Sequence, residues 1–357
     1  MINVTRTYLP PLEQYEKYLK ELWENRWVTN NGKFVQQLEE DIKKYLGVKH
    51  FFYCTNGTVV LQMAIKALRL KGKIITTPFS YVATVNSILW EECEPVFVDV
   101  KASDCCIDEA LIEQQITADT SAILATHVYG NPCNVDVIKK IADKNNLKVI
   151  YDGAHAFGTA LNGKQLLSYG DVSTCSFHAT KLFHTIEGGG IMTNDDEVAR
   201  QLYLFRQFGH VYDEYFSVGI NAKNSEFHAA IGLCLLPEVE KFIEKRKLVA
   251  DWYAEELKGL KIQLPHSSLN IRYNHAYHPL IFESEKKLLA VMEGLKAENI
   301  FARRYFYPSL NTLPFVKKVS CPVSEDISAR VLSLPLFYEI TKEEVGLISS
   351  VIKKSMN

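Results

Sequence analysis

The sequence has no regular spacing among its cysteines. Its eight cysteines are scattered along 357 residues, and none of them forms a Cys-x-x-Cys pair. This distribution argues against a disulfide framework and against a zinc site, so we expect no metal. We interpret the cysteines as reduced thiols of the protein core.

Long apolar runs and an excess of charge of one sign are also missing. The first residues, Met1–Arg6, contain no apolar signal core, and no later stretch approaches the roughly 20 apolar residues that a membrane span needs. Forty basic residues stand against 42 acidic ones, a formal net charge of -2. No chain-wide basic field would hold a nucleic acid or an anionic membrane. We therefore expect a cytoplasmic protein that binds neither.

Two nucleotide-binding fingerprints do not occur in the chain. There is no GxxxxGK[ST] loop and no GxGxxG turn, which counts against binding of nucleoside triphosphates or dinucleotides. What the chain does have is apolar material, because 47% of its residues are hydrophobic and 23% are charged. That composition is typical of a folded protein with a large core and enough residues for a second, smaller domain.

Short β-like runs alternate with helical patterns over the first 240 residues. An amphipathic helix over 34–46, which ends at Gly47, opens the series. The predicted strands are 51–54, 74–76, 96–100, 122–126, 148–152, 172–177 and 190–193, and the helices between them are 58–70, 81–91, 134–145 and 195–206. This alternation requires crossover connections. It predicts an α/β fold with a large, mostly parallel seven-stranded sheet and helices on both faces.

The pattern changes near residue 240. A long charged helix is predicted over 238–260, followed by segments at 261–264 and 276–282, a helix at 285–298, a strand near 300–304 and a final helix at 341–355. We therefore expect two domains. Residues 1–240 would form the large α/β domain with an N-terminal arm and entry helix, and residues 241–357 a smaller C-terminal α+β domain.

One lysine stands out because of its place after a predicted strand. The segment Ser173–Lys181 leaves the strand and leads to Glu187-Gly188-Gly189-Gly190. A loop lysine is most often simply solvated. On a rigid strand-end loop, however, a lysine amine can be desolvated and act as a nucleophile, and glycines beside it let a ligand approach. Taken alone, the segment leaves both alternatives open.

Two further segments end predicted strands in polar groups. Asp152 ends a buried apolar strand and is either a turn or cap residue or the partner of a protonated pyridine nitrogen. His155 is either a core histidine or a group that touches such a ring. The turn Asn56-Gly57-Thr58 joins a strand to a helix, whose N-terminus suits a phosphate.

Taken in order, these segments resemble the DegT/DnrJ/EryC1/StrS sugar aminotransferases, which are fold-type I pyridoxal phosphate enzymes. The resemblance covers nearly the whole chain. It is carried by residues 56–58, 77–84, 152–155, 176–181, 187–189, 219–221, 229–232 and 307–308.

The resemblance implies a pyridoxal phosphate-dependent nucleotide-sugar aminotransferase. Lys181 would hold the cofactor as a Schiff base and, with Asp152 at the pyridine nitrogen, would be catalytic. Tyr81 would stack on the ring, and His155 would hydrogen-bond or stack. The phosphate would be bound by Gly57, Thr58 and Ser176.

The resemblance also implies a homodimer with active sites at the subunit interface. Asn221 would reach the phosphate bound in the partner subunit. The family often has Asn-Tyr-Arg at this point, whereas this chain has Asn221-Ala222-Lys223. The role of Lys223 is therefore open.

The motif Ser-Phe-His-x-x-Lys, which ends at Lys181 and is followed by Glu187-Gly188-Gly189, resembles that of family members that aminate the fourth carbon of a hexose more than that of members that aminate the third. By resemblance, dTDP-4-keto-6-deoxy-D-glucose would become dTDP-4-amino-4,6-dideoxy-D-glucose with L-glutamate as donor, for cell-surface polysaccharide such as the O-antigen of lipopolysaccharide. Amination at C3 of a dTDP-3-keto-6-deoxyhexose, a pyridoxal phosphate-dependent sugar dehydratase and a non-catalytic scaffold protein remain alternatives. Candidate substrate residues, which packing would explain equally well, are Thr29, His178, His184, Glu187, Lys223, Arg304 and Tyr305.

Overall fold

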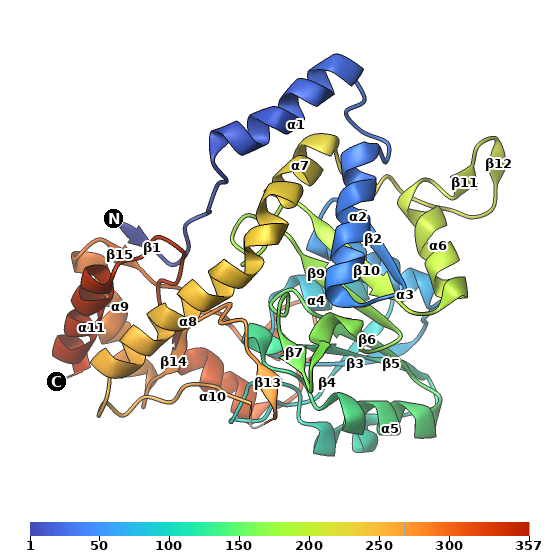
Figure 1. The fold of residues 1–357 in the computed structure, drawn as a ribbon. Coiled ribbons are helices and arrows are strands. Elements are labelled where there is room, and N and C mark those ends of the chain that lie inside the picture. Colours follow the sequence, from blue (N-terminus) through green and yellow to red (C-terminus); the bar gives the residue numbers. More distant parts are fainter. Residues whose placement is uncertain (268, 357) are drawn as a thin grey trace.

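The structure is a computed structural model that describes residues 1–267 and 269–356. Its centre is a seven-stranded sheet with the order β2-β10-β9-β6-β5-β3-β4 (Figure 1). These strands are β2 (His50–Cys54), β10 (Gly189–Thr193), β9 (Val172–Ser176), β6 (Lys148–Asp152), β5 (Thr120–Thr126), β3 (Lys73–Thr76) and β4 (Glu94–Phe97). Within this sheet, β10 runs antiparallel to both neighbours and the other pairings are parallel. The predicted α/β fold is confirmed.

Helices cover both faces of the sheet because its central strands are apolar on both sides. In β5, Ile123 packs into one hydrophobic cluster and its neighbour Leu124 into another, as the two-residue period of a strand requires. The first cluster includes side chains of α2 (Lys33–Leu46), α5 (Val135–Asn145) and α7 (Glu226–Leu235). The second includes those of α3 (Gly57–Ala67), α4 (Ala83–Trp90) and α6 (Asp196–Arg206).

A separate hydrophobic cluster lies in the C-terminal part of the chain. The long helix α8 (Val239–Glu256) joins the two regions, since Phe242 packs into the sheet's cluster and Val249 into the C-terminal one. The C-terminal cluster also contains side chains of α9 (Glu285–Ala297), α11 (Lys342–Met356), β14 (Pro279–Ile281) and β16 (Val331–Ser333). A domain division near residue 240 remains our proposal, and the start of α8 is the element nearest to it.

Several elements differ from the sequence-based expectations. The prediction did not include α1 (Leu12–Asn25), α7 or α10 (Pro322–Arg330). The segment 98–100, expected in a strand, follows the end of β4, and Gln263 makes an isolated bridge to Ile281 instead of belonging to a strand. The N-terminal β1 (Ile2–Asn3), which we counted with the large domain, pairs with β15 (Ile300–Phe301) of the C-terminal region.

The remaining strands are short and lie outside the central sheet. They are β7 (Ala160–Leu161), β8 (Lys164–Gln165), β13 (Ile271–Arg272), β11 (His210–Val211) and β12 (Glu214–Tyr215). The hairpin of β11 and β12 projects from the body of the molecule (Figure 1). Among the described residues, no helix is both long and apolar enough to cross a membrane.

A buried ion pair clamps the edge of the sheet. Glu39 of α2 pairs with Arg206, the last residue of α6. The Glu39 carboxylate also accepts a hydrogen bond from the Tyr53 N–H at 2.7 Å, and the Arg206 guanidinium donates one to the Tyr53 carbonyl at 3.3 Å. Only 3% of the Arg206 side chain is exposed. Helices on opposite faces are thus tied together around edge strand β2.

Replacing Glu39 by alanine is expected to lower the free energy of unfolding by about 3 to 5 kcal/mol, because it leaves the Arg206 charge buried and unpaired. Glu40, the next residue, is an exposed partner of Lys43, and Glu40→Ala is the matched control. Urea unfolding monitored by circular dichroism should show a much lower midpoint for Glu39→Ala than for Glu40→Ala. Equal midpoints would contradict the clamp.

Candidate active site

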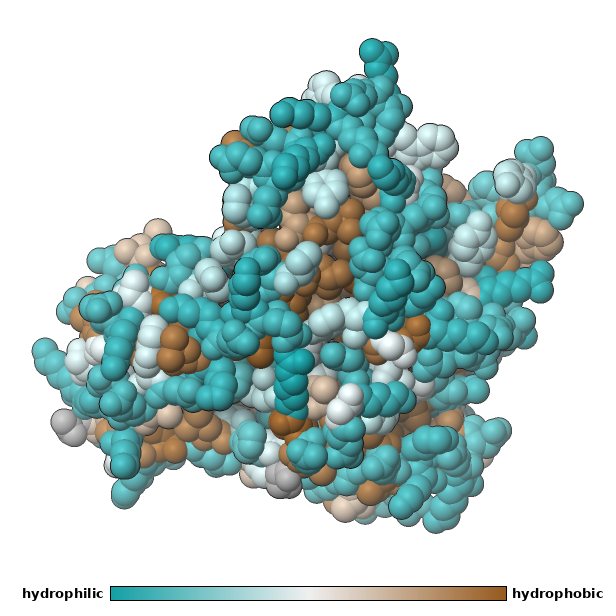
Figure 2. Space-filling view, viewed as in Figure 1, coloured by the Kyte–Doolittle hydropathy of each residue, from teal (hydrophilic) through white to brown (hydrophobic). Residues whose placement is uncertain are grey.

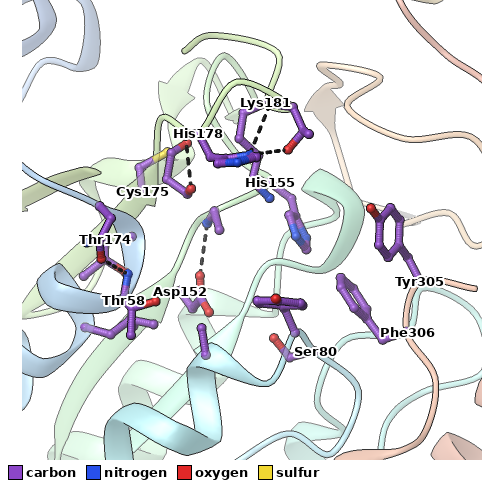
Figure 3. Close-up of a pocket in the computed structure, with 18 of the residues that line it drawn as sticks. Thr58, Ser80, Asp152, His155, Thr174, Cys175, His178, Lys181, Tyr305 and Phe306 are labelled. Atoms are coloured by element: carbon purple, nitrogen blue, oxygen red, sulfur yellow. Dashed lines mark hydrogen bonds between the residues drawn. The ribbon is translucent and has the colours of Figure 1, made fainter. Parts of the chain in front are cut away.

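A cavity of about 330 Å³ lies at the carboxyl ends of the parallel strands, the edge at which open α/β sheets bind ligands. Figure 3 shows Asp152, Thr58 and Lys181 on different sides of it, with Tyr305 and Phe306 closing another side. The predicted site residues that line the cavity are Gly57, Thr58, Tyr81, Asp152, His155, Ser176, His178, Lys181, Glu187 and Tyr305. Residues that are up to 248 positions apart in the sequence are therefore brought together.

Lys181 extends into the cavity from the loop that follows β9. This loop is fixed at its base by backbone hydrogen bonds from the Phe177 N–H to the Gly188 carbonyl and from the Thr185 N–H to the Phe177 carbonyl. The Lys181 Nζ donates a hydrogen bond to the Tyr277 hydroxyl at 3.1 Å. Burial lowers the pKa of Lys181, but Tyr277 and then Asp152 raise it by more, so that it ends above its ordinary value.

Asp152 is a buried carboxylate at the end of β6, with 5% of its surface exposed. Its Oδ2 accepts a hydrogen bond from the Thr84 hydroxyl at 2.7 Å, and its Oδ1 accepts one from the Ala154 N–H at 3.1 Å. A chain of hydroxyls stands behind Thr84, with Thr126 donating to Ser80 and Ser80 adjacent to Thr84 at 2.8 Å. All these protons can point towards the carboxylate, which suits a negative charge.

No cationic side chain in the described part of the protein forms an ion pair with Asp152. A carboxylate that is buried in this way and still faces a cavity fits a protonated ring nitrogen of a ligand. The donor set around Asp152 therefore agrees with the pyridine end of pyridoxal phosphate.

His155 is a neutral imidazole on the same side of the cavity. Burial, together with the nearby Lys181, holds the pKa of His155 well below its ordinary value. Its Nδ1 accepts a hydrogen bond from the Tyr129 N–H at 3.2 Å, so the ring proton belongs on Nε2. The ring stacks on Phe306, with centroids 5.4 Å apart and planes 10° from parallel. Such an imidazole can donate a hydrogen bond into the cavity.

The N-terminus of α3 forms the third side of the cavity. Asn56 caps the helix, and its side-chain oxygen accepts hydrogen bonds from the N–H groups of Thr58 and Val59 at 3.1 and 2.9 Å. A Cβ on Gly57 would lie 2.9 Å from the Ser176 Cβ, so only glycine lets the helix start against the end of β9. The hydroxyls of Thr58 and Ser176 stand beside a helix N-terminus, an arrangement that fits a phosphate.

Tyr81, His178 and Glu187 lie at the mouth of the cavity. Tyr81 is 60% exposed and lines both this cavity and a larger one beside it. The His178 Nδ1 lies 2.8 Å from the Thr180 hydroxyl, and the His178 Nε2 lies 3.6 Å from a Glu187 carboxylate oxygen. Each of these side chains can therefore reach a ligand that enters from solvent.

Arg304 lies in the larger adjoining cavity of about 1120 Å³, which shares Tyr81 and Tyr305 with the first. Its guanidinium already donates to the Glu285 carboxylate at 2.8 Å and to the Ala329 carbonyl at 2.6 Å. It also lies over the Tyr307 ring, 3.6 Å from its centroid. All these hydrogen bonds come from one guanidinium nitrogen, Nη2, and the buried Nε has no hydrogen-bond partner among the described residues.

Four other predicted residues do not line the first cavity in this chain. His184 is buried, and its Nε2 bonds to the Tyr8 carbonyl at 2.9 Å, an ordinary packing role. Thr29 is exposed in the loop after α1. Asn221 and Lys223 lie at the base of the projecting hairpin, where the Lys223 amine donates to the Asn221 side chain at 2.7 Å.

Tyr277 and Phe306, which line the cavity, and Thr84, which donates a hydrogen bond to Asp152, were not among the candidate site residues from the sequence. Thr84 lies within a segment that carries the family resemblance, and a threonine after a strand is compatible with many roles. Phe306 belongs to an aromatic run, residues 305–307, of which only Tyr305 was a candidate site residue. Tyr277 has no motif around it, and its hydrogen bond to Lys181 joins residues 96 positions apart.

The comparisons with known proteins agree with this geometry. The model of the DegT/DnrJ/EryC1/StrS aminotransferase family matches residues 12–353. A dTDP-4-amino-4,6-dideoxy-D-glucose transaminase from Shigella dysenteriae is 40% identical over 363 residues, covering 99% of this chain and 98% of that protein. A protein of the same name from Escherichia coli is 38% identical, with 99% of each chain covered.

Solved structures are similar as well. The structure of DesI in the presence of its TDP-sugar product matches with a TM-score of 0.93 and 29% identity, covering 100% of this chain and 93% of that one. With the family match over nearly the whole length, the fold and the cavity geometry together, the chain belongs to the DegT/DnrJ/EryC1/StrS aminotransferase family.

Proposed function

We propose that this aminotransferase converts dTDP-4-keto-6-deoxy-D-glucose into dTDP-4-amino-4,6-dideoxy-D-glucose, with L-glutamate as amino donor and pyridoxal phosphate as cofactor. The observation that carries the proposal is a single cavity that presents the Lys181 amine, the Asp152 carboxylate and the N-terminus of α3 on three sides. These are the groups needed for the aldehyde, ring nitrogen and phosphate of the cofactor.

The residues of the cavity divide the chemistry among them. When bound, pyridoxal phosphate supplies an electron sink for cleavage of a C–H bond beside an amine. Asp152 would hold the ring nitrogen in its protonated form, His155 would donate a hydrogen bond from Nε2, and Tyr81 would cover the ring. Lys181 would bind the cofactor through Nζ, and the freed Nζ would serve as the base that takes up the proton from the donor carbon and as the acid that gives it up again.

The proposed substrate draws support from two sources, of which the first bears on the fourth sugar carbon and the second on the nucleotide. The Shigella and Escherichia relatives, at 40% and 38% identity over nearly the whole length, are both named for a 4-amino sugar linked to dTDP. The adjoining cavity, lined by Arg303, Arg304 and the exposed ring of Tyr307, offers cationic and aromatic surface for a nucleotide diphosphate. We further propose that the amino sugar serves cell-surface polysaccharide.

Two of the three alternatives would not require Lys181. The dehydratase branch of the family has histidine in place of this lysine, and a scaffold protein would be free to lose it or Asp152. Both residues are present and face the cavity. Amination at C3 would use the same catalytic groups and differ only in how the sugar is placed.

We also propose a homodimer in which Asn221 completes the phosphate site of the partner. The support is the apolar surface of the projecting hairpin, where Tyr212, Tyr215 and Val218 are 91%, 77% and 84% exposed. A monomer rarely leaves so many large apolar side chains together in solvent. Figure 2 shows further apolar side chains gathered in the hollow between α1 and α2.

The covalent role of Lys181 can be tested by visible absorbance. The purified wild-type protein should show a visible absorbance band that borohydride abolishes, and Lys181→Ala should lack the band because no amine remains to bind the aldehyde. Lys164→Ala, which removes an exposed lysine of β8, should keep it. A Lys181→Ala protein that keeps the wild-type band would contradict the covalent role of Lys181.

The substrate can be tested with a panel of 3-keto and 4-keto nucleotide sugars. Incubated with glutamate, the enzyme should yield a dTDP-linked sugar aminated at C4, as identified by NMR, while Lys181→Ala yields none. Formation of 3-amino products alone would refute the proposed substrate and leave the aminotransferase chemistry intact.

The homodimer can be tested by charging the hairpin. Val218→Asp should shift the protein towards the monomer in sedimentation experiments, because a carboxylate would have to be buried at the interface. Leu289→Asp on α9, a 49% exposed apolar side chain away from the hairpin, is the control and should leave the mass unchanged. A Val218→Asp protein that sediments like the wild type would contradict the use of this hairpin.

A further inference from the structure

Tyr277 lies where it can control the reactive amine, although no motif marks it. It lines the same cavity as Lys181 and Asp152. Within the described chain, its hydroxyl is the only hydrogen-bond acceptor of the Lys181 Nζ, at 3.1 Å. The Lys181 Nζ lies 5.7 Å from the Tyr277 ring centroid, beyond the hydroxyl end of the ring. The amine is therefore held by one side chain from the C-terminal part of the chain.

The position of the Tyr277 hydroxyl is fixed by its neighbours. Asn274 is fully buried, and its amide donates to the carbonyls of His155 and Phe157 at 2.8 and 2.9 Å. The Asn274 oxygen accepts from the Ala276 N–H at 3.0 Å. The Tyr277 ring packs edge-on against His155, with centroids 4.8 Å apart. The segment that carries Tyr277 is thus fixed to the loop after β6, which carries His155.

The surroundings of the amine explain why such an acceptor matters. An ammonium group in this buried cavity is penalised by desolvation. Tyr277, Asp152 of β6 and Cys175 of β9 act in the opposite direction and raise the pKa of Lys181. The remaining titratable neighbours are His155, which is neutral, and Tyr305, whose ring packs edge-on against Tyr277 with centroids 5.9 Å apart. Tyr277 is the member of this set that touches Nζ.

We propose that Tyr277 is the positioning residue for proton transfer by Lys181, with its hydroxyl oxygen holding the charged amine in place while Nζ carries the proton. The inference rests on the proposed aminotransferase chemistry of the same site. Tyr277 would act after Nζ has taken up the proton from the amino donor and before Nζ gives the proton up again. Without the hydroxyl, the pKa of Lys181 would be lower. The amine could also move away from the position in which it transfers the proton.

The test uses Tyr277→Phe, which removes the hydroxyl and keeps the ring. Full-length wild type and variant are purified free of pyridoxal phosphate, and the rate of its covalent attachment is followed by visible absorbance across a pH series. Only the neutral amine attacks the aldehyde, so the rate rises as Lys181 loses its proton. Because Tyr277 raises the pKa of Lys181, its removal should move the midpoint of this rise to lower pH.

Tyr273→Phe is the matched control. The Tyr273 hydroxyl belongs to the same segment and donates to the Tyr129 carbonyl at 2.9 Å, without touching Lys181. It should leave the midpoint where the wild type has it. With cofactor and substrates, Tyr277→Phe should lower kcat by about tenfold, a part of the roughly 100-fold or larger contribution of an acid–base group, while KM for the sugar stays within about twofold.

Two results would overturn the proposal. One is a Tyr277→Phe midpoint that coincides with the wild type, and the other is an equal shift in Tyr273→Phe, which would mean that loosening the segment is enough. The attachment rate is measured without any sugar, so its outcome is independent of whether the proposed 4-keto substrate is correct.

Discussion

Burying a carboxylate is costly unless a cation or several hydrogen-bond donors accompany it, and the cavity depends on how this chain buries Asp152. Hydrogen bonds from the Thr84 hydroxyl and the Ala154 N–H satisfy part of the charge. No side chain of residues 1–267 or 269–356 supplies an ion pair to it. The carboxylate is therefore prepared for a cation that comes from outside the chain. A protonated pyridine ring meets this requirement and is the cofactor of the proposed reaction.

The rest of the structure serves to place other groups around that carboxylate. The parallel strands bring Asp152 and the lysine loop to one edge of the sheet, and the glycine at the start of α3 lets a helix N-terminus approach the end of β9. The C-terminal region adds Tyr277, Tyr305 and Phe306, which close the cavity from a part of the chain more than 90 residues beyond Lys181. Asn274 ties this region to the loop after β6. The Lys181 amine thus lies between the sheet region and the C-terminal region, and groups of both regions influence its pKa.

The fold could be predicted because it depends on local patterns, whereas the roles expected of Asp152 and Lys181 came from the resemblance of several segments taken in order. Alternating strands and helices determine the sheet, and polar residues that end buried strands, such as Asp152, gather at one edge. Tyr277 and Thr84 could not be predicted in this way, since their roles arise from contacts between residues far apart in sequence. His184 was a candidate substrate residue because a histidine lies close to a reactive lysine in the sequence. In the structure, its ring bonds to the Tyr8 carbonyl, and burial lowers its pKa. The first residues illustrate the same limit, since pairing of β1 with β15 spans nearly the whole chain.

The most direct test of this account is the protonation state of the bound ring. Pyridoxal phosphate labelled with nitrogen-15 in the ring, bound to the full-length protein, reports by NMR whether that nitrogen carries a proton. We expect a protonated nitrogen in the wild type and an unprotonated one in Asp152→Asn, because the amide offers no negative charge to balance the ring. The same nitrogen signal in both proteins would contradict the role of Asp152.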